Sequence, residues 1–156
     1  MNVRKCFYAC VASVMLAGSF TSCGDDIETP DIPVNPEEQP KEISGFYILN
    51  RGSNGENNSS VHFYDYATSQ LSADIYQKVN NSSLGESAQQ MLIYGSKIYV
   101  AVTFSNRLAV LDMDGKLLKT IEPEEGGNTM NPRCLAADGG RVYMTYFNGH
   151  AVAALD

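Results

Sequence analysis

Two segments of the chain repeat each other at a fixed distance, and this repeat limits the folds that the chain can adopt. Residues 87–112, SAQQMLIYGSKIYVAVTFSNRLAVLD, align without a gap with residues 131–156, NPRCLAADGGRVYMTYFNGHAVAALD, at an offset of 44 (131 − 87). Identical residues occur at Gly95/Gly139, Tyr99/Tyr143, Ala109/Ala153, Leu111/Leu155 and Asp112/Asp156. A period in the forties, with several short apolar runs and Gly turns in each unit, predicts an all-β chain made of β-propeller blades.

The apolar runs predict up to four strands in each blade, named A for the innermost to D for the outermost. An earlier unit joins the same pattern if Tyr47 is aligned with Tyr99. We expect strand A at Gln90–Tyr94 and Arg133–Ala137, strand B at Phe46–Asn50, Lys97–Thr103 and Arg141–Phe147, strand C at Val61–Asp65, Leu108–Asp112 and Ala151–Asp156, and strand D at Leu71–Val79 and Leu117–Ile121.

The B strands decide between two all-β architectures. Ile98–Val102 is apolar at every position, which favours sheets that are covered on both faces, as stacked blades are. A two-layer sandwich would leave one polar face on each sheet and is the alternative fold. Residues 43–156 provide about two and a half blades, whereas a closed propeller has at least four. We therefore expect a truncated piece of a longer propeller; an intact small protein is the alternative.

The first 22 residues have the pattern of a lipoprotein signal peptide. After Arg4 and Lys5, the apolar run Phe7–Phe20 is too short to span a bilayer. It ends in Phe20-Thr21-Ser22-Cys23, which resembles a bacterial lipobox with Phe20 where Leu is usual. We expect Cys23 to be acylated and to begin the mature chain. An ordinary signal peptide with an incidental Cys is the alternative.

Residues 23–42 predict a spacer that carries the folded domain away from a membrane. Gly24–Glu42 contains four of the six prolines and seven acidic residues, a composition that cannot bury a core. The acids directly after the lipobox, Asp25, Asp26 and Glu28, resemble the surface-export signal of certain Gram-negative lipoproteins. We expect a lipid-anchored protein on the surface of the outer membrane; simple solubility of the spacer is the alternative explanation for the acids.

Charge and cysteine content exclude several function classes. The net charge is −7, without a cluster of Lys or Arg, which argues against a nucleic-acid partner. Cys134 is the one Cys left after processing and lies in an apolar run, so we expect a buried, inert thiol.

Asp112-Met113-Asp114-Gly115 lacks the later ligands of a calcium loop and is expected to be a hairpin turn, and no other metal site is expected. No catalytic triad or nucleotide-binding motif appears, so we do not expect an enzyme or a cofactor.

Several motifs together resemble the YncE-like β-propeller lipoproteins of Gram-negative outer membranes. They are Gly45–Asn50 with its Asn/Gly loop, Phe63-Tyr64-Asp65, Asn131-Pro132-Arg133 and Asp138–Tyr143. The resemblance covers residues 43–156. It implies a seven-bladed propeller and a binding role. The family includes surface lipoproteins that capture cobalamin and pass it to an outer-membrane transporter, which makes cobalamin a ligand to test.

The loops that follow the B strands and precede the A strands predict the ligand site, because these loops meet near the axis of a propeller. They combine amides with aromatic rings and arginines, the mixture expected of a small-molecule site. The candidate residues are Arg51, Asn54, Asn58, Phe104, Asn106, Asn131, Arg133, Phe147 and Asn148. Asn residues also shape tight turns, whereas Phe104 and Arg133 are hard to explain in that way.

Three function classes follow from these features. We favour a lipid-anchored binding protein that takes up a small molecule, with a possible transporter as partner. A surface scaffold for protein–protein interaction is the first alternative. A propeller enzyme of the lactonase type is the second, although no acid–base group for it is visible.

Overall fold

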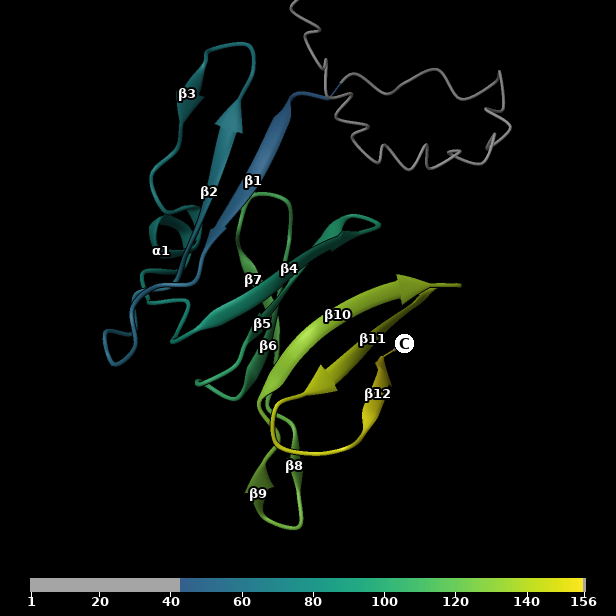
Figure 1. Cartoon of the computed structure of the whole chain (residues 1–156). Helices are drawn as coiled ribbons and strands as arrows, with labels where there is room; N and C mark the ends of the chain where they lie inside the picture. Colours follow the sequence, from purple (N-terminus) through teal and green to yellow (C-terminus); the bar gives the residue numbers. More distant parts are fainter. Residues whose placement is uncertain (1–42, 156) are drawn as a thin grey trace, which may run out of the picture. The chain divides into compact units, whose positions relative to one another are not determined.

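The polypeptide forms a series of antiparallel β-sheets, shown by a computed structural model that describes residues 43–155. The predicted signal peptide, the acylated Cys23 and the spacer lie outside the described residues. In order, the elements are β1 Gly45–Asn50, β2 Ser60–Asp65, β3 Gln70–Leu71, α1 Ile75–Asn80, β4 Ala88–Tyr94, β5 Lys97–Val102, β6 Arg107–Leu111, β7 Leu117–Ile121, β8 Glu124–Glu125, β9 Asn128–Thr129, β10 Pro132–Asp138, β11 Arg141–Tyr146 and β12 Val152–Leu155 (Figure 1).

The strands follow one another in space as they do in sequence. Strands β1–β2–β3 form sheet 1, β4–β5–β6–β7 form sheet 2, and β10–β11–β12 form sheet 3, each with neighbouring strands antiparallel. Sheet 2 has the four-stranded A-to-D order that the repeat predicts for a blade. The all-β fold class is confirmed. Strand β7 has the predicted bounds, and the predicted A, B and C strands shift by no more than two residues at either end among the described residues.

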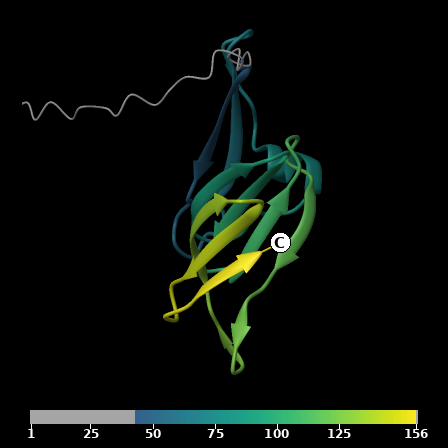
Figure 2. The same ribbon diagram turned by 90° about the vertical axis from the view of Figure 1, so that its right-hand side faces the viewer.

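Sheet 2 lies between the other two sheets and is apolar on both faces (Figures 1 and 2). Along β5, Ile98, Val100 and Val102 pack into a core shared with sheet 1, where Val61 and Tyr76 are also buried. The alternate residues Tyr99 and Ala101 pack into a second core, which contains side chains of sheet 3. This is why β5 is apolar at every position after Lys97. A two-layer sandwich does not have such a middle sheet.

The two repeats enter sheets 2 and 3 through the same backbone geometry. Ser87 and Asn131, which are 44 residues apart (131 − 87), both have positive φ angles, of 59° and 55°. In each repeat the carbonyl of that residue accepts a hydrogen bond from the residue after the B strand: Thr103 N donates to Ser87 O over 3.0 Å, and Phe147 N donates to Asn131 O over 2.8 Å. The repeat in the sequence is therefore a repeat of hydrogen bonds between main-chain atoms.

The prediction of a D strand at Leu71–Val79 is wrong. Only Gln70–Leu71 is a strand, and the helix α1 follows it. The Asp74 side chain caps this helix by accepting hydrogen bonds from the backbone N–H groups of Tyr76 and Gln77, at 3.0 and 3.3 Å. At the other end Asn81 adopts a left-handed conformation and its N–H bonds Gln77 O. Capping by Asp74 and Asn81, together with burial of Tyr76, favours a helix over a strand.

A small hairpin that the sequence reading did not predict follows sheet 2. Strands β8 and β9 are joined by Gly126 and Gly127, both with positive φ angles, of 59° and 79°. Two residues with positive φ form the tight turn that suits the twist of a hairpin, and Gly adopts them without strain. Among the described residues, no helix is long and apolar enough to cross a membrane.

The expectation of a buried Cys134 is also wrong, because this side chain is exposed. In β10 its neighbour Leu135 is buried against sheet 2, whereas Cys134 and Ala136 lie on surface that the described residues 43–155 leave open. The apolar run around Cys134 therefore has only one buried side in this structure. The thiol is accessible to reagents.

Candidate functional site

A cavity of about 220 Å³ lies where the B strands of the three sheets end. Two arginines, two phenylalanines, one glutamine and one threonine line it: Arg51, Gln89, Thr103, Phe104, Arg133 and Phe147. We call it the mouth cavity. Four of these residues, Arg51, Phe104, Arg133 and Phe147, are among the site residues that the sequence predicts.

Repetition of the fold explains why these positions converge. Arg51, Thr103 and Phe147 are equivalent residues, because each comes directly after the B strand of its sheet. Thr103 and Phe147 are separated by the repeat offset of 44 (147 − 103), and Arg51 and Thr103 by the offset of the Tyr47/Tyr99 alignment (52 for both 103 − 51 and 99 − 47). Gln89 and Arg133 form a second equivalent pair, also 44 residues apart (133 − 89). Five of the six lining residues therefore occupy two structural positions. At each position the residue type differs from one sheet to the next.

Irregularities in the two inner strands direct Gln89 and Arg133. The pairing of β4 with β5 shifts register between Ala88 and Gln90, and that of β10 with β11 shifts between Pro132 and Leu135. A bulge bends its strand and changes the direction of the extra side chain. In both strands the irregular residues lie at the end next to the mouth cavity. Gln89 and Arg133 are thereby exposed at its edge.

The two aromatic rings and one arginine of the mouth cavity are in contact. Phe104 and Phe147 pack edge to face with ring centroids 6.2 Å apart. The guanidinium carbon of Arg133 lies 5.4 Å from the centroid of the Phe147 ring, within the range of a cation–π interaction. Both rings remain about half exposed, Phe104 at 47% and Phe147 at 52%. Apolar surface and a positive charge are thus adjacent and open to solvent.

Arg51 is oriented by the loop that follows β1. Its Nη2 donates to Asn54 Oδ1 over 3.1 Å, and the same oxygen accepts a longer hydrogen bond of 3.4 Å from Ser87 Oγ. Asn54, a predicted site residue, therefore holds Arg51 and does not line the cavity. The loop itself is attached to sheet 2 by the bond from Gly55 N to Glu86 Oε1, at 2.8 Å.

The remaining predicted asparagines shape turns and do not line the mouth cavity. Asn58 Oδ1 accepts from Ser53 N at 2.8 Å, and Asn148 Nδ2 donates to Thr129 O at 3.3 Å. Asn106 has a positive φ of 47°, and its Oδ1 accepts from Asn131 N over 2.8 Å. Asn131 in turn enters β10 with a positive φ. These contacts agree with the alternative that the sequence left open for asparagine.

Sequence reasoning missed Gln89 and Thr103. Thr103 is buried at 2% exposure, and its Oγ1 donates to Pro132 O over 2.7 Å, so it joins sheets 2 and 3 beneath the cavity. The signal for both residues was present in the repeat, since Gln89 aligns with Arg133 and Thr103 aligns with Phe147. Applying the repeat to the site as well as to the strands would have found them.

A family model described as a domain of unknown function, DUF5074, matches residues 44–151 of the 156-residue chain. The match covers more than two thirds of the sequence. The chain belongs to this family. DUF5074 is β-propeller-like, in agreement with the stacked antiparallel sheets. No curated protein shows significant similarity to the chain.

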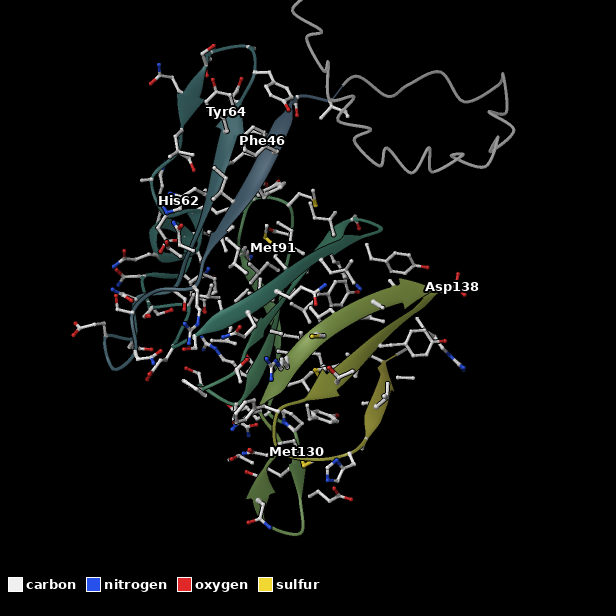
Figure 3. All side chains as sticks on the ribbon, viewed as in Figure 1. Phe46, His62, Tyr64, Met91, Met130 and Asp138 are labelled. Atoms are coloured by element: carbon white, nitrogen blue, oxygen red, sulfur yellow. The ribbon has the colours of Figure 1, made fainter. Side chains whose placement is uncertain are left out.

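All six residues of the mouth cavity fall inside the DUF5074 match. A larger space, of about 700 Å³, lies at the other end of the same sheets and is also inside the domain except for Ile43. Figure 3 shows Phe46 and Met91 at this apolar groove, where β1 and β4 diverge. Ten residues line it: Ile43, Ser44, Gly45, Phe46, Tyr47, Phe63, Met91, Leu92, Ile93 and Met113.

The apolar groove is the larger space, but the mouth cavity has more of the chemistry of a ligand site. No charged side chain lines the groove, and its one titratable side chain is Tyr47. Burial, and to a smaller extent the negative charges of Asp114 and Asp112, raise the pKa of Tyr47 above its ordinary value. Its hydroxyl is already used, because it donates to Met113 O over 2.6 Å. A selective ligand needs convergent polar groups besides apolar area, and only the mouth cavity of these two has them.

His62 and Asp112 of the DUF5074 domain hold strands and turns of the fold. His62 in β2 is within 3.0 Å of both Ser60 Oγ and Ser72 O. Asp112 Oδ1 accepts from Asp114 N and Lys116 N, at 3.0 and 2.9 Å, which is the hairpin turn that the sequence predicts there. Within residues 43–155, no group of three or more His, Cys, Asp or Glu side chains is arranged to hold a metal ion.

Proposed function

We propose that this DUF5074 chain is a lipid-anchored surface protein that binds a small molecule at the mouth cavity and serves its uptake. One observation carries the proposal: equivalent positions of three sheets converge on a single cavity, and there they present arginine and phenylalanine. Turn formation does not require these residue types, and all four are more than one third exposed at the ends of well-packed sheets. Cavities that combine apolar area with a few convergent polar groups are typical of ligand sites.

The N-terminal sequence supports attachment to a membrane. The lipobox-like segment Phe20–Cys23 favours acylation of Cys23, and each buried methylene of an acyl chain contributes about 0.8 kcal/mol to membrane binding. The acidic, proline-rich spacer after it favours a position at some distance from the bilayer, roughly 50–60 Å if the 19 residues from Gly24 to Glu42 are extended. We place the domain on the outer face of a Gram-negative outer membrane.

The finer assignment is a seven-bladed propeller of the YncE-like type. Its support is the four-stranded order of sheet 2, the stacking of three sheets and the motifs Gly45–Asn50 and Asn131–Arg133. In this assignment the ligand is passed to an outer-membrane transporter, and cobalamin is the first compound to test, with only one part of this large molecule entering the cavity of about 220 Å³. The chain acts as a binding protein and not as an enzyme.

Calorimetry on the acylated full chain in neutral lipid nanodiscs tests the proposal. The chain is titrated with cobalamin and with a panel of smaller vitamins. We expect Phe104→Ala and Arg133→Ala each to weaken binding of the active compound by about 1–3 kcal/mol, without a change in the thermal unfolding curve. If a compound binds the wild type and both variants equally well, the mouth cavity is not its site.

Two control variants match these changes outside the mouth cavity. Phe46→Ala removes a phenylalanine of similar exposure, 43% against 47% for Phe104, from the apolar groove. Lys97→Ala removes one positive charge from the opposite end of β5. Both are expected to bind as the wild type does. A loss confined to Phe46→Ala would move the ligand to the groove and contradict the proposal.

A further inference from the structure

We infer that the mouth cavity selects organic anions in which a carboxylate or phosphate is attached to a flat apolar ring. The inference rests on the proposed function and adds to it the chemical class of the ligand. It uses three properties of the site: its charge, the unused hydrogen-bond donors of its arginines, and the position of its two rings.

The charge of the mouth cavity is opposite to that of the whole chain. The chain has a net charge of −7 and its residues 43–156 one of −3 (8 Lys and Arg against 11 Asp and Glu), yet the cavity is lined by two arginines and by no Asp or Glu. Opposite charges a few ångströms apart attract strongly where water is partly excluded. An anion is therefore bound at this place on an otherwise acidic protein, and its affinity falls as salt concentration rises.

The arginines retain donors for such an anion. A guanidinium carries five N–H donors in one plane, suited to paired hydrogen bonds with a carboxylate or phosphate. Arg51 uses Nη2 to bind Asn54. Arg133 contacts the Phe147 ring, and within residues 43–155 no hydrogen-bond acceptor or carboxylate engages it. Most of the N–H groups of the two arginines are thus available to a ligand.

The phenylalanines supply the surface for a ring. Phe104 and Phe147 meet edge to face, and both are about half exposed at the cavity. A third ring placed against them gains apolar contact while its acid group reaches Arg133, which lies beside Phe147. A volume of about 220 Å³ has room for one small fused ring with its acid group. Gln89 adds a neutral polar group at the edge, whereas Thr103 lies beneath the cavity.

Four probes separate the contributions of charge and ring. 2-Naphthoate and 2-naphthyl phosphate have both features, 2-naphthalenemethanol has the ring alone, and acetate has the charge alone. The chain contains no Trp, so naphthyl fluorescence can be excited without a background from the protein at long wavelength. The three naphthyl probes are titrated by fluorescence against the acylated full chain in neutral lipid nanodiscs, with protein-free nanodiscs as the blank. Acetate is tested by its ability to displace 2-naphthoate.

We expect the two naphthyl anions to bind at least ten-fold more tightly than 2-naphthalenemethanol, and acetate to bind too weakly to measure. Arg133→Gln and Arg51→Gln should each reduce the affinity for the anions about ten-fold and leave the affinity for 2-naphthalenemethanol unchanged. Phe147→Leu should weaken all three naphthyl probes. Lys97→Gln removes the same charge from the far end of β5 and should change none of them.

The outcomes distinguish this inference from the proposed function. Equal binding of 2-naphthoate and 2-naphthalenemethanol, with both weakened by Phe104→Ala, would overturn the anion class and leave the site in place. Arginine variants that bind the anions as tightly as the wild type would overturn it as well. If Phe104→Ala and Phe147→Leu also had no effect on any probe that binds, the mouth cavity itself would be rejected.

Discussion

The side-chain amide of Gln90 makes two hydrogen bonds to the backbone of Leu135, 45 residues further along the chain. Gln90 Nε2 donates to Leu135 O over 2.9 Å, and Gln90 Oε1 accepts from Leu135 N over 2.7 Å. The amide thus pairs with Leu135 as the backbone of a neighbouring strand would. It links β4 to β10 at the place where the bulge of β10 ends. Gln90 therefore helps to fix sheet 3 on sheet 2 next to the mouth cavity, together with the Thr103–Pro132 hydrogen bond and the shared core.

Removing this amide is expected to destabilise the fold. Gln90→Leu leaves a backbone N–H and a backbone C=O without partners, and we expect the free energy of unfolding to fall by about 1–3 kcal/mol. Urea denaturation followed by circular dichroism measures the change. Gln89→Leu is the control, because Gln89 is the neighbouring residue and is exposed. If both variants unfold at the same urea concentration as the wild type, the paired hydrogen bonds do not stabilise the interface between the sheets.

The cap of α1 gives a second stability prediction. Asp74 Oδ1 accepts from Tyr76 N, from Gln77 N and, over 3.2 Å, from Val61 N in β2. Asp74→Ala removes the acceptor of all three hydrogen bonds and should lower the free energy of unfolding by about 1–2 kcal/mol. Asp74→Asn keeps one side-chain oxygen and should cost less than Asp74→Ala. Equal unfolding midpoints for the two variants would contradict the assignment of Asp74 as the cap.

The raised pKa of Tyr47 predicts how the free energy of unfolding changes at high pH. Burial, followed by the charges of Asp114 and Asp112, raises the pKa of Tyr47 above the ordinary 10.0 that the unfolded chain retains. Between these two values the unfolded state has lost the proton that the folded state keeps. The free energy of unfolding therefore falls as pH rises through this window, and below it the contribution is complete. Tyr146 contributes with the same sign, since burial and then Glu125 raise its pKa.

The test is unfolding by urea at a series of pH values from about 8 to 11. We expect Tyr47→Phe to be less stable than the wild type at the lower pH, because it loses the hydrogen bond to Met113 O. The loss of stability with rising pH should be smaller in Tyr47→Phe than in the wild type. Tyr66→Phe, at an exposed tyrosine, should reproduce the wild-type pH dependence. The same pH dependence in all three proteins would count against a raised pKa of Tyr47.

Acylation of Cys23 can be tested by its consequence for the location of the protein. Cys23→Ser should block lipid attachment and release the chain from the membrane fraction, whereas Cys134→Ser should leave it there. Mass spectrometry of the mature N-terminus should find lipid on Cys23 in the wild type. An unmodified N-terminus at another residue would contradict the lipoprotein assignment.

The sequence predicted strands well where the repeat supplied a second copy for comparison. Inside the repeat, β4, β5 and β10 extend or end within two residues of the predicted bounds. Strand β7 lies outside the two copies and also has the predicted bounds. The failure at residues 71–79 lies in the first unit, where the outer element is a helix. The sequence signals of this helix are the two capping residues, Asp74 and Asn81, which enclose a segment of only six residues. Such a short helix has almost no periodicity to reveal it.

Part of the candidate site was also predictable from the sequence. Arg51, Phe104, Arg133 and Phe147 stood out because their residue types are not those of turns. The asparagines were grouped with them because a sequence does not show whether an amide faces a ligand or a neighbouring N–H. Exposure of Cys134 depends on what covers sheet 3, which its own apolar run does not show.

The hydrogen bonds that form the mouth turns have a consequence for how such a protein changes over generations. Thr103 N to Ser87 O and Phe147 N to Asn131 O are bonds between main-chain atoms, so any residue except proline can donate them at positions 103 and 147. Gln89 and Arg133, likewise, sit at bulges where no side-chain hydrogen bond of their own is needed to keep the strand paired. A duplicated unit thus keeps the turn, together with positions at which new side chains can be accommodated. Mutation can alter what the protein recognises without first having to rebuild the architecture that displays it.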